Sequence, residues 1–223
     1  MKPRRLTHLI AVAGITALTP LLGTTAAHAS TAAGNYYLEN DSTSFANNTL
    51  ECADLPGTGS EPSGTAVWMD SCLIGSGSTD NQVFGFEYTR TVDGQNLYVI
   101  VDVASGKCLD LPGYGSEPAG AQVTLYTCNT NSANDNQEWF LNTVQAGFTE
   151  IENFKSSGDP SNKADPNNEC LDVDGWAADL TDTANRTKLG IYTCSNTSPS
   201  GNWGGLVINN VAYDDHLWNL ISA

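Results

Sequence analysis

Three pairs of cysteines at nearly equal spacing constrain this chain more than any other feature of its sequence. The second cysteine of each pair follows the first by 20, 20 and 24 residues. Pairs that recur at the same place in successive segments indicate one disulfide inside each of three units. A metal site built from these cysteines is disfavoured, because none of them stand in Cys-x-x-Cys spacing. The predicted bridges are Cys52–Cys72, Cys108–Cys128 and Cys170–Cys194.

The sequence around the cysteines repeats as well. Residues 52–64 match residues 108–120 almost one for one, as Cys-x-Asp-Leu-Pro-Gly-x-Gly-Ser-Glu-Pro-x-Gly. A third copy keeps Cys-Leu-Asp-Val at 170–173 and ends in Ile-Tyr-Thr-Cys at 191–194. Such self-similarity indicates one supersecondary unit used three times, which cannot bury its apolar face alone. Each copy closes with an aromatic residue, at Phe84, Trp139 and Trp218.

The pattern inside each copy is that of short strands joined by turns. Alternating apolar and polar stretches are separated by Pro-Gly, Ser-Gly and Asn-rich clusters, and no helical period is sustained. Charged residues make up only 15% of the chain, against a usual value of about 25%. We therefore predict an all-β fold in which three four-stranded units share one core. The units lie at about 36–92, 93–147 and 148–223, within a single domain at 30–223.

The N-terminal segment has the features of a secretory signal peptide. Basic residues lie within 2–5, residues 6–22 are mostly apolar, and the small residues Ala27 and Ala29 offer a cleavage site. An uncleaved membrane anchor is the alternative, which the cleavage site disfavours. We expect a signal peptide at 1–29 and a secreted, extracellular protein, in a compartment where disulfides form.

The charge of the chain excludes two classes of partner. The chain has 25 acidic and 9 basic residues and a formal net charge of −16. A surface of this sign repels phosphate backbones and anionic lipid. We therefore expect no nucleic acid and no membrane partner, while a neutral or cationic ligand stays compatible with the charge.

The repeated Cys-x-Asp motif, with a second cysteine further along and a terminal Gln-x-aromatic motif, resembles the ricin B-type lectin domain. The middle copy is the most specific, from residues 106–110 through residues 136–139. The xylan- and galactose-binding modules of secreted bacterial hydrolases share this domain. The resemblance implies a β-trefoil with pseudo-threefold symmetry, in which six strands close a barrel and six cap it as hairpins. It also places Phe84, Trp139 and Trp218 in the shared core.

The resemblance further implies which side chains hold a sugar. In the family, an aspartate two residues after the first cysteine accepts hydrogen bonds from adjacent hydroxyls. An aromatic ring two residues before the second cysteine lies against the C–H face, and an Asn-Gln pair reads hydroxyl geometry. The middle copy has all four, as Asp110, Tyr126, Asn136 and Gln137. The third copy keeps Asp172 and Tyr192 but has Asp215-His216 in place of the amides, and it carries an insertion at 195–213.

The first copy departs most from this set. It keeps Asp54, Asn81 and Gln82, but Asp70 stands at the stacking position. Trp68 is two residues earlier, on the same strand face and about 6–7 Å further along the strand. We expect this site to be inactive, the middle site to be the main one, and the third to be the second candidate.

These observations predict a secreted lectin that binds galactose- or xylose-type glycans through shallow sites, as a monomer and without catalysis, cofactor or metal. The alternative is a secreted protein-binding trefoil, such as an inhibitor or the targeting subunit of a larger complex. A glycosidase acid pair has no supporting motif. A Ser-His-Asp triad is poorly supplied, because His216 is the only histidine after the leader.

Overall fold

The computed structural model describes residues 34–75, 80–129, 135–145, 147–158, 165, 167–174, 186–195, 206–208 and 211–223. These residues belong to one unit of the chain, Thr31–Ala223. The signal peptide expected at 1–29 lies outside the described residues, as does most of the insertion expected at 195–213.

Four antiparallel strands recur three times along the chain. The first four are β1 (Gly34–Asn40), β2 (Glu51–Asp54), β3 (Trp68–Ser71) and β4 (Val83–Val92). The next four are β5 (Gln95–Asp102), β6 (Lys107–Asp110), β7 (Thr124–Tyr126) and β8 (Trp139–Gln145). The last four are β9 (Phe148–Asn153), β10 (Glu169–Val173), β11 (Leu189–Thr193) and β14 (Trp218–Ser222).

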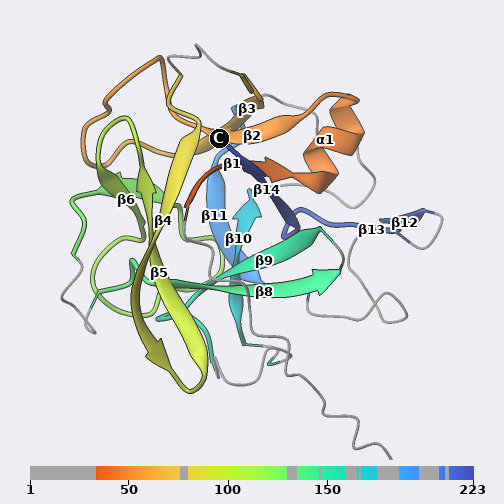
Figure 1. Cartoon of the computed structure of the whole chain (residues 1–223). Coiled ribbons are helices and arrows are strands. Elements are labelled where there is room, and N and C mark those ends of the chain that lie inside the picture. Colours follow the sequence, from red (N-terminus) through yellow and green to blue (C-terminus); the bar gives the residue numbers. More distant parts are fainter. Residues whose placement is uncertain are drawn as a thin grey trace, which may run out of the picture. The chain divides into compact units, whose positions relative to one another are not determined.

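Six of these strands close a ring. Strand β1 pairs with β4, β4 with β5, β5 with β8, β8 with β9 and β9 with β14, and β14 returns to β1. All of these pairings are antiparallel. The ring is the six-stranded barrel of a β-trefoil, as predicted, and Figure 1 shows its strands crossing at the centre of the view.

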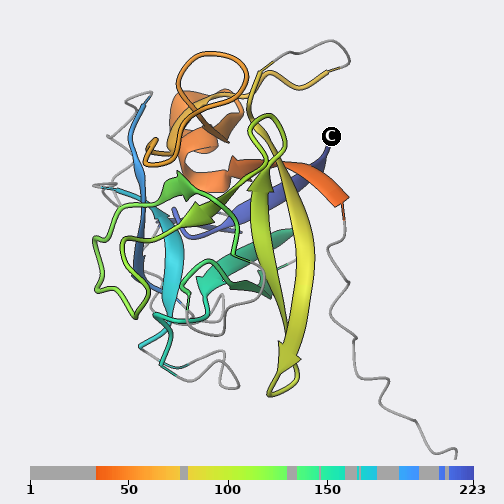
Figure 2. The ribbon, with the colours of Figure 1, turned by 90° about the vertical axis from the view of Figure 1, so that its left-hand side faces the viewer.

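The other six strands form three hairpins, β2–β3, β6–β7 and β10–β11. The hairpins also touch one another, through isolated bridges that join Ala66 to Thr124, Trp68 to Lys188 and Gln122 to Gly190. Each hairpin therefore contacts the other two, which gives the cap its threefold arrangement. Figure 2 shows the hairpins at one side of the barrel, away from the long β4–β5 hairpin.

The core lies where the barrel and the cap meet. The three aromatic residues that close the repeats, Phe84, Trp139 and Trp218, are all fully buried. The indole of Trp139 donates to the carbonyl of Leu109 at 3.5 Å, and that of Trp218 donates to the carbonyl of Leu171 at 3.0 Å. Each indole thus ties a barrel strand to the hairpin of its own repeat.

The disulfides have the predicted pairing. In each disulfide the first cysteine lies in the first strand of a hairpin. The second cysteine follows the end of the second strand by one or two residues, and the Cα–Cα distances are 4.9 to 5.0 Å. Crosslinks of this kind restrict the unfolded chain and hold the hairpin ends together. The bridges are Cys52–Cys72, Cys108–Cys128 and Cys170–Cys194.

Two elements add to the twelve strands. Helix α1 (Asp41–Asn47) follows β1, and a small hairpin of β12 (Leu206–Ile208) and β13 (Val211–Tyr213) interrupts the third repeat. The sequence analysis predicted neither. Asn40 caps α1, because its side chain accepts a hydrogen bond from the backbone N–H of Thr43 at 3.1 Å. The cap stabilises a helix that is too short to give a periodic pattern of apolar residues in the sequence. With its seven residues, this helix is not long enough to cross a bilayer, and no other helix occurs in the described part of the chain.

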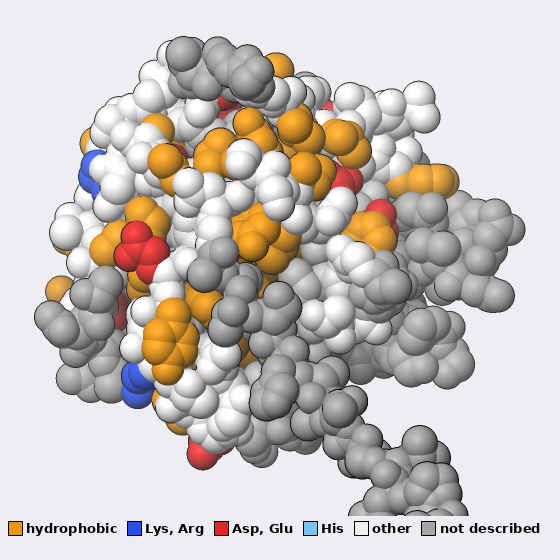
Figure 3. Space-filling view, viewed as in Figure 1, with side chains coloured by type: hydrophobic (Ala, Val, Ile, Leu, Met, Phe, Trp, Pro, Cys, Tyr) orange, Lys and Arg blue, Asp and Glu red, His pale blue; other side chains and the backbone are white. Residues whose placement is uncertain are grey.

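Many acidic side chains are buried rather than displayed. On the face drawn in Figure 3, apolar patches lie among uncharged polar surface and charged groups are sparse. Buried carboxyl groups lose hydration, so that their protonation depends on the partners they find inside. The buried acids are Glu39, Asp41, Glu51, Asp54, Asp102, Asp110, Asp135, Glu138, Glu150, Glu152, Asp172, Asp214 and Asp215.

Candidate functional site

The hairpin of the middle repeat places Asp110 and Tyr126 on one face. Cys108 pairs with Tyr126 and Asp110 pairs with Thr124, and residues opposite each other or two apart along a strand share a face. Leu109, between Cys108 and Asp110, points the other way into the core. Asp110 and Tyr126 are therefore diagonal neighbours on the face of the hairpin that points away from the core.

A hydrogen bond from Gln137 fixes the carboxyl group of Asp110. Its Oδ1 accepts a hydrogen bond from Nε2 of Gln137 at 3.0 Å, and the residue is 7% exposed. Burial raises the pKa of Asp110 to about 6, although the hydrogen bond from Gln137 opposes this rise. The negative charge of Asp135 raises the pKa of Asp110 further. The Oδ2 atom accepts no hydrogen bond from the described residues and is available to a ligand.

Gln137 serves the hairpin as well as Asp110. Its Nε2 also donates to the carbonyl of Thr127 at 3.1 Å, and its Oε1 accepts from the backbone N–H of Asn129 at 2.8 Å. The residue is 1% exposed. Its amide is therefore fully used inside the protein, where it fixes the carboxyl group of Asp110 against the end of β7.

Asn136 holds the loop that follows Asp110. Its Nδ2 donates to the carbonyls of Pro112 and Gly115, at 3.3 and 3.2 Å, and the residue has no exposed surface. The resemblance implied that Asn136 and Gln137 read hydroxyl groups directly. In the structure both amides are buried and donate to groups of the protein itself.

Two exposed aromatic residues follow Asp110 in the sequence of this repeat. Tyr126 is 52% exposed, as a stacking ring requires, and Tyr114 in the loop pinned by Asn136 is 71% exposed. The sequence analysis missed Tyr114. The signal was present, because Tyr114 replaces Thr58 within two segments that otherwise match closely.

The first repeat has its site filled by its own side chains. The indole of Trp68 donates to Oδ2 of Asp54 at 3.0 Å, directly across the β2–β3 hairpin. The guanidinium of Arg186 lies 5.4 Å from the Trp68 ring, and its Nε is 3.9 Å from Asp70. Asp70 stands where the middle repeat has Tyr126. In the first repeat the carboxylate of Asp54 therefore has Asp70, and no aromatic ring, at this position of its hairpin.

In the third repeat an ionic cluster replaces the amides. Asp172 is buried and Tyr192 is 54% exposed, on the same face of the β10–β11 hairpin. His216 stands where the middle repeat has Gln137, and its Nε2 lies 3.1 Å from Oδ1 of Asp172. Its Nδ1 lies 2.9 Å from Oδ1 of Asp214 and 2.9 Å from the hydroxyl of Ser195.

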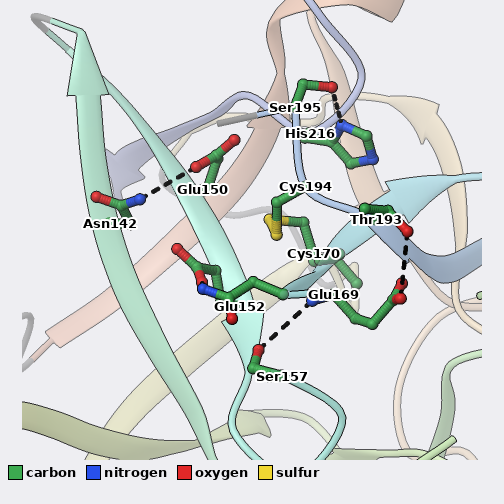
Figure 4. Close-up of a disulfide and its surroundings, with 12 residues drawn as sticks. Asn142, Glu150, Glu152, Ser157, Glu169, Cys170, Thr193, Cys194, Ser195 and His216 are labelled. Atoms are coloured by element: carbon green, nitrogen blue, oxygen red, sulfur yellow. Dashed lines mark hydrogen bonds between the residues drawn. A yellow bond between two sulfur atoms is a disulfide. The ribbon is translucent and has the colours of Figure 1, made fainter. Parts of the chain in front are cut away.

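The charges in this cluster shift one another's pKa values. Burial alone lowers the pKa of His216, but the contacts with Asp172 and Asp214 outweigh it and hold the pKa well above its usual value. Burial raises the pKa of Asp214, but His216 overrides this effect and lowers it to about 2. Burial raises the pKa of Asp215 to about 9 against the attraction of His216. Figure 4 shows the His216 ring beside the Cys170–Cys194 disulfide, with one nitrogen toward Ser195.

A further aspartate recurs at all three sites and was not singled out from the sequence. Asp80 and Asp135 each accept the backbone N–H of the next residue at 2.9 Å, and Asp214 accepts that of His216 at 3.0 Å. The signal is the repeated Asp-Asn-Gln, Asp-Asn-Gln and Asp-Asp-His. These aspartates shape the turn that presents the next two side chains.

Comparison with known proteins agrees with this architecture. Residues 80–183 match the family model described as "Ricin-type beta-trefoil lectin domain-like". None of the curated proteins matches the sequence. This match confirms the predicted resemblance to ricin-type β-trefoil lectin domains, and together with the solved structures below it confirms the predicted fold class.

Solved structures resemble the fold of this chain over more residues than the family model matches. The designed threefold-symmetric protein ThreeFoil is 21% identical, with a TM-score of 0.54 over 84% of this chain and 99% of its own. The Rhizoctonia solani agglutinin is 18% identical, with a TM-score of 0.53 over 86% of this chain and 96% of its own. A mosquitocidal holotoxin is 18% identical, with a TM-score of 0.52 over 86% of this chain and 17% of the holotoxin. At these identities the likeness extends to the fold alone.

Proposed function

We propose that this protein is a secreted, monomeric lectin that binds galactose- or xylose-type glycans mainly through Asp110 and Tyr126. One observation carries the proposal: of the three hairpins, only that of the middle repeat combines a ring at the stacking position with a carboxylate that is free of ionic partners. A ricin-type lectin domain supports carbohydrate binding, while the choice of sugar and of site is part of the proposal.

The chemistry of the site fits a sugar. Oδ2 of Asp110 can accept from two neighbouring hydroxyls, and hydrogen bonds to a charged acceptor are the stronger ones. The ring of Tyr126 offers an apolar face to the C–H groups of the same sugar. Gln137 keeps the carboxyl group in place, so that little side-chain entropy is lost on binding.

Asp172 and Tyr192 form the second candidate site. Their strand positions match those of Asp110 and Tyr126, and Tyr192 is equally exposed. The difference is His216, whose positive charge already satisfies Asp172. A sugar hydroxyl gains less from a carboxylate that is paired with a cation, so we expect this site to be the weaker one for a bare sugar.

Glycan-array binding followed by calorimetry tests this proposal. Asp110→Ala is expected to remove most affinity for the best glycan, because a site of about 4–5 kcal/mol loses 1–3 kcal/mol when one partner is left unpaired. Asp54→Ala is the matched control at the same position of the first repeat and is expected to bind like the parent. If Asp110→Ala binds normally and Asp172→Ala does not, the site assignment is wrong.

The same experiment separates the lectin from its rivals. A protein-binding trefoil gives no glycan hit on the array at any concentration that saturates a lectin. A glycosidase releases reducing sugar from the glycan it binds, which we do not expect because no sequence motif supports a glycosidase acid pair.

A further inference from the structure

The third repeat differs from the other two by a specific exchange of chemistry. His216 takes the place of Gln82 and Gln137, and Asp215 takes the place of Asn81 and Asn136. Two neutral amides thereby become an imidazole and a second carboxyl group beside Asp172. We propose that Asp172, Asp215 and His216 bind a divalent transition-metal ion, with zinc as the best match.

The spacing of the three side chains suits one small ion. One ligand atom from each of Asp172, Asp215 and His216 lies within 4.8 Å of the other two. Nε2 of His216 and Oδ1 of Asp172 are 3.1 Å apart. Zinc binds nitrogen and oxygen at about 2.0–2.2 Å, so that two ligands of a tetrahedral ion stand about 3.3 Å apart. The observed distance is thus close to that of two ligands on one zinc.

The imidazole presents its Nε2 to this space, at 3.1 Å from Oδ1 of Asp172. His216 is 5% exposed, and its Nε2 makes no hydrogen bond with the described residues, although it lies beside Asp172. A buried polar atom without a hydrogen bond is costly and requires an explanation. A metal ion would provide one, since neutral imidazole nitrogen is a common zinc ligand.

The other ring nitrogen is held as it is in metal-binding histidines. Nδ1 lies 2.9 Å from Oδ1 of Asp214 and 2.9 Å from the hydroxyl of Ser195. The backbone N–H of His216 also donates to Asp214, at 3.0 Å. A carboxylate on the far nitrogen fixes the ring orientation and directs Nε2 toward the ion. Figure 4 shows the hydrogen bond between the His216 ring and Ser195, with the second ring nitrogen turned away from Ser195.

Charge and access favour the same assignment. Once Asp215 has released its proton, its carboxylate and that of Asp172 balance a divalent ion, which takes over the positive charge that a protonated ring otherwise supplies. The side chains of Asp172 and Asp215 are each 11% exposed, so that an ion can reach the cluster from solvent. An imidazole ligand selects zinc over calcium and magnesium, which prefer oxygen. Three protein ligands leave the fourth tetrahedral position for a water molecule or a ligand hydroxyl.

Calorimetric titration of the full chain with Zn²⁺ tests the proposal without any sugar. We expect one ion per chain, and His216→Gln is expected to weaken binding at least ~100-fold by removing one of three ligands. This variant restores the glutamine found in the other repeats. Asp214→Asn is expected to weaken binding about 10–100-fold through loss of ring orientation. Asp54→Asn, at the position of Asp172 in the first repeat, is the matched control and should bind like the parent.

Histidine-selective NMR identifies the ligand. The chain also has His8 and His28, and the His216→Gln spectrum assigns the His216 signals by their absence. Zn²⁺ is expected to shift His216. The proposal is overturned if the parent binds no Zn²⁺, if only His8 or His28 responds, or if Ca²⁺ binds as tightly as Zn²⁺. If His216→Gln loses its near-UV circular dichroism, Asp215→Asn is used in its place. Zn²⁺ binding that is unchanged in Asp215→Asn also overturns the proposal.

Discussion

At the scale of single residues, each site is decided by what satisfies one buried aspartate. Asp54 accepts a hydrogen bond from the indole of Trp68, Asp110 accepts one from the amide of Gln137, and Asp172 lies beside the imidazole of His216. The amide and the indole are neutral donors and add no charge. The imidazole, whose pKa is raised, sets a positive charge beside Asp172. One position in the fold therefore gives three different kinds of chemistry.

The pKa of Asp110 sets a pH limit for binding. Burial raises this pKa to about 6, and a carboxylate accepts stronger hydrogen bonds than a carboxylic acid. Glycan affinity is thus expected to fall as the pH drops through 6, about tenfold between pH 7 and pH 5. Calorimetry at both pH values measures the effect. Asp110→Asn cannot ionise, so its residual affinity should not change over this range, and a parent curve as flat as the variant's would contradict the assignment.

Tyr114 is expected to add to the middle site. It is 71% exposed in the loop that Asn136 pins beside Asp110. Tyr114→Ala should weaken glycan binding by about 0.5–1 kcal/mol, a few-fold in affinity, if the ring contacts the sugar. Thr58→Ala changes the matching residue of the first repeat and should leave affinity unchanged. Equal effects of the two substitutions would assign the loss to loop structure instead.

At the scale of strands and hairpins, the closing aromatic residue couples the barrel to the cap. Trp139 and Trp218 each donate to a carbonyl in the hairpin of their own repeat, whereas Phe84 has no donor to offer. The first repeat thus relies on apolar packing alone at this junction. The closing aromatic residue therefore joins the two layers of the fold.

Trp139→Ala is expected to lower the free energy of unfolding by about 3–5 kcal/mol, because it removes a fully buried ring at the junction of strand β8 and the middle hairpin. Chemical denaturation measures this change. Tyr126→Ala is the matched control, since it removes an exposed ring from the same repeat and should change stability little. A small loss in Trp139→Ala would mean that the core closes over the cavity.

At the scale of the whole molecule, the buried acids make stability depend on pH. Burial raises the pKa of Asp41 to about 7, with help from the charge of Glu39, and it raises the pKa values of Asp54 and Asp110 to about 6. A group whose pKa is raised by folding binds its proton more tightly in the folded state. Folding therefore gains free energy at low pH from these groups and loses it as the pH rises.

The melting temperature is accordingly expected to be higher at pH 5 than at pH 8. The contribution of Asp41, Asp54 and Asp110 is complete below about pH 4 and is lost between pH 4 and pH 7, on the order of 1 kcal/mol for each group after allowance for solvent screening. Thermal unfolding at constant ionic strength measures the difference. Asp41→Asn should reduce the pH dependence, and a higher melting temperature at pH 8 would contradict this account.

The repeat made the fold predictable from sequence. Equal cysteine spacing and the matching segments 52–64 and 108–120 specified three equivalent units, and the fold follows from their shared core. Helix α1 was not predictable in the same way, because a seven-residue helix held by the Asn40 cap has no period to detect. The β12–β13 hairpin lies in an insertion with no counterpart in the other repeats.

The site was predictable in its residue types and less so in their roles. Position in the repeat located Asp110 and Tyr126, since strand register places both on one face of the hairpin. That Asn136 is fully buried depends on the path of the loop at 112–115, which no local pattern encodes. The ionic cluster around His216 likewise requires distances between hairpin and barrel that only the folded chain provides.

The closure of the barrel has a consequence for the order of folding events. Strand β14 completes the ring by pairing with β9 and with β1, and β14 and β1 lie at opposite ends of the domain sequence. The barrel therefore cannot close before the last strand is available, and contacts of such long range make folding slow. Each disulfide, in contrast, lies within one hairpin. In an oxidising compartment the three hairpins can thus be oxidised one after another, and barrel closure is the final step that brings them together as a cap.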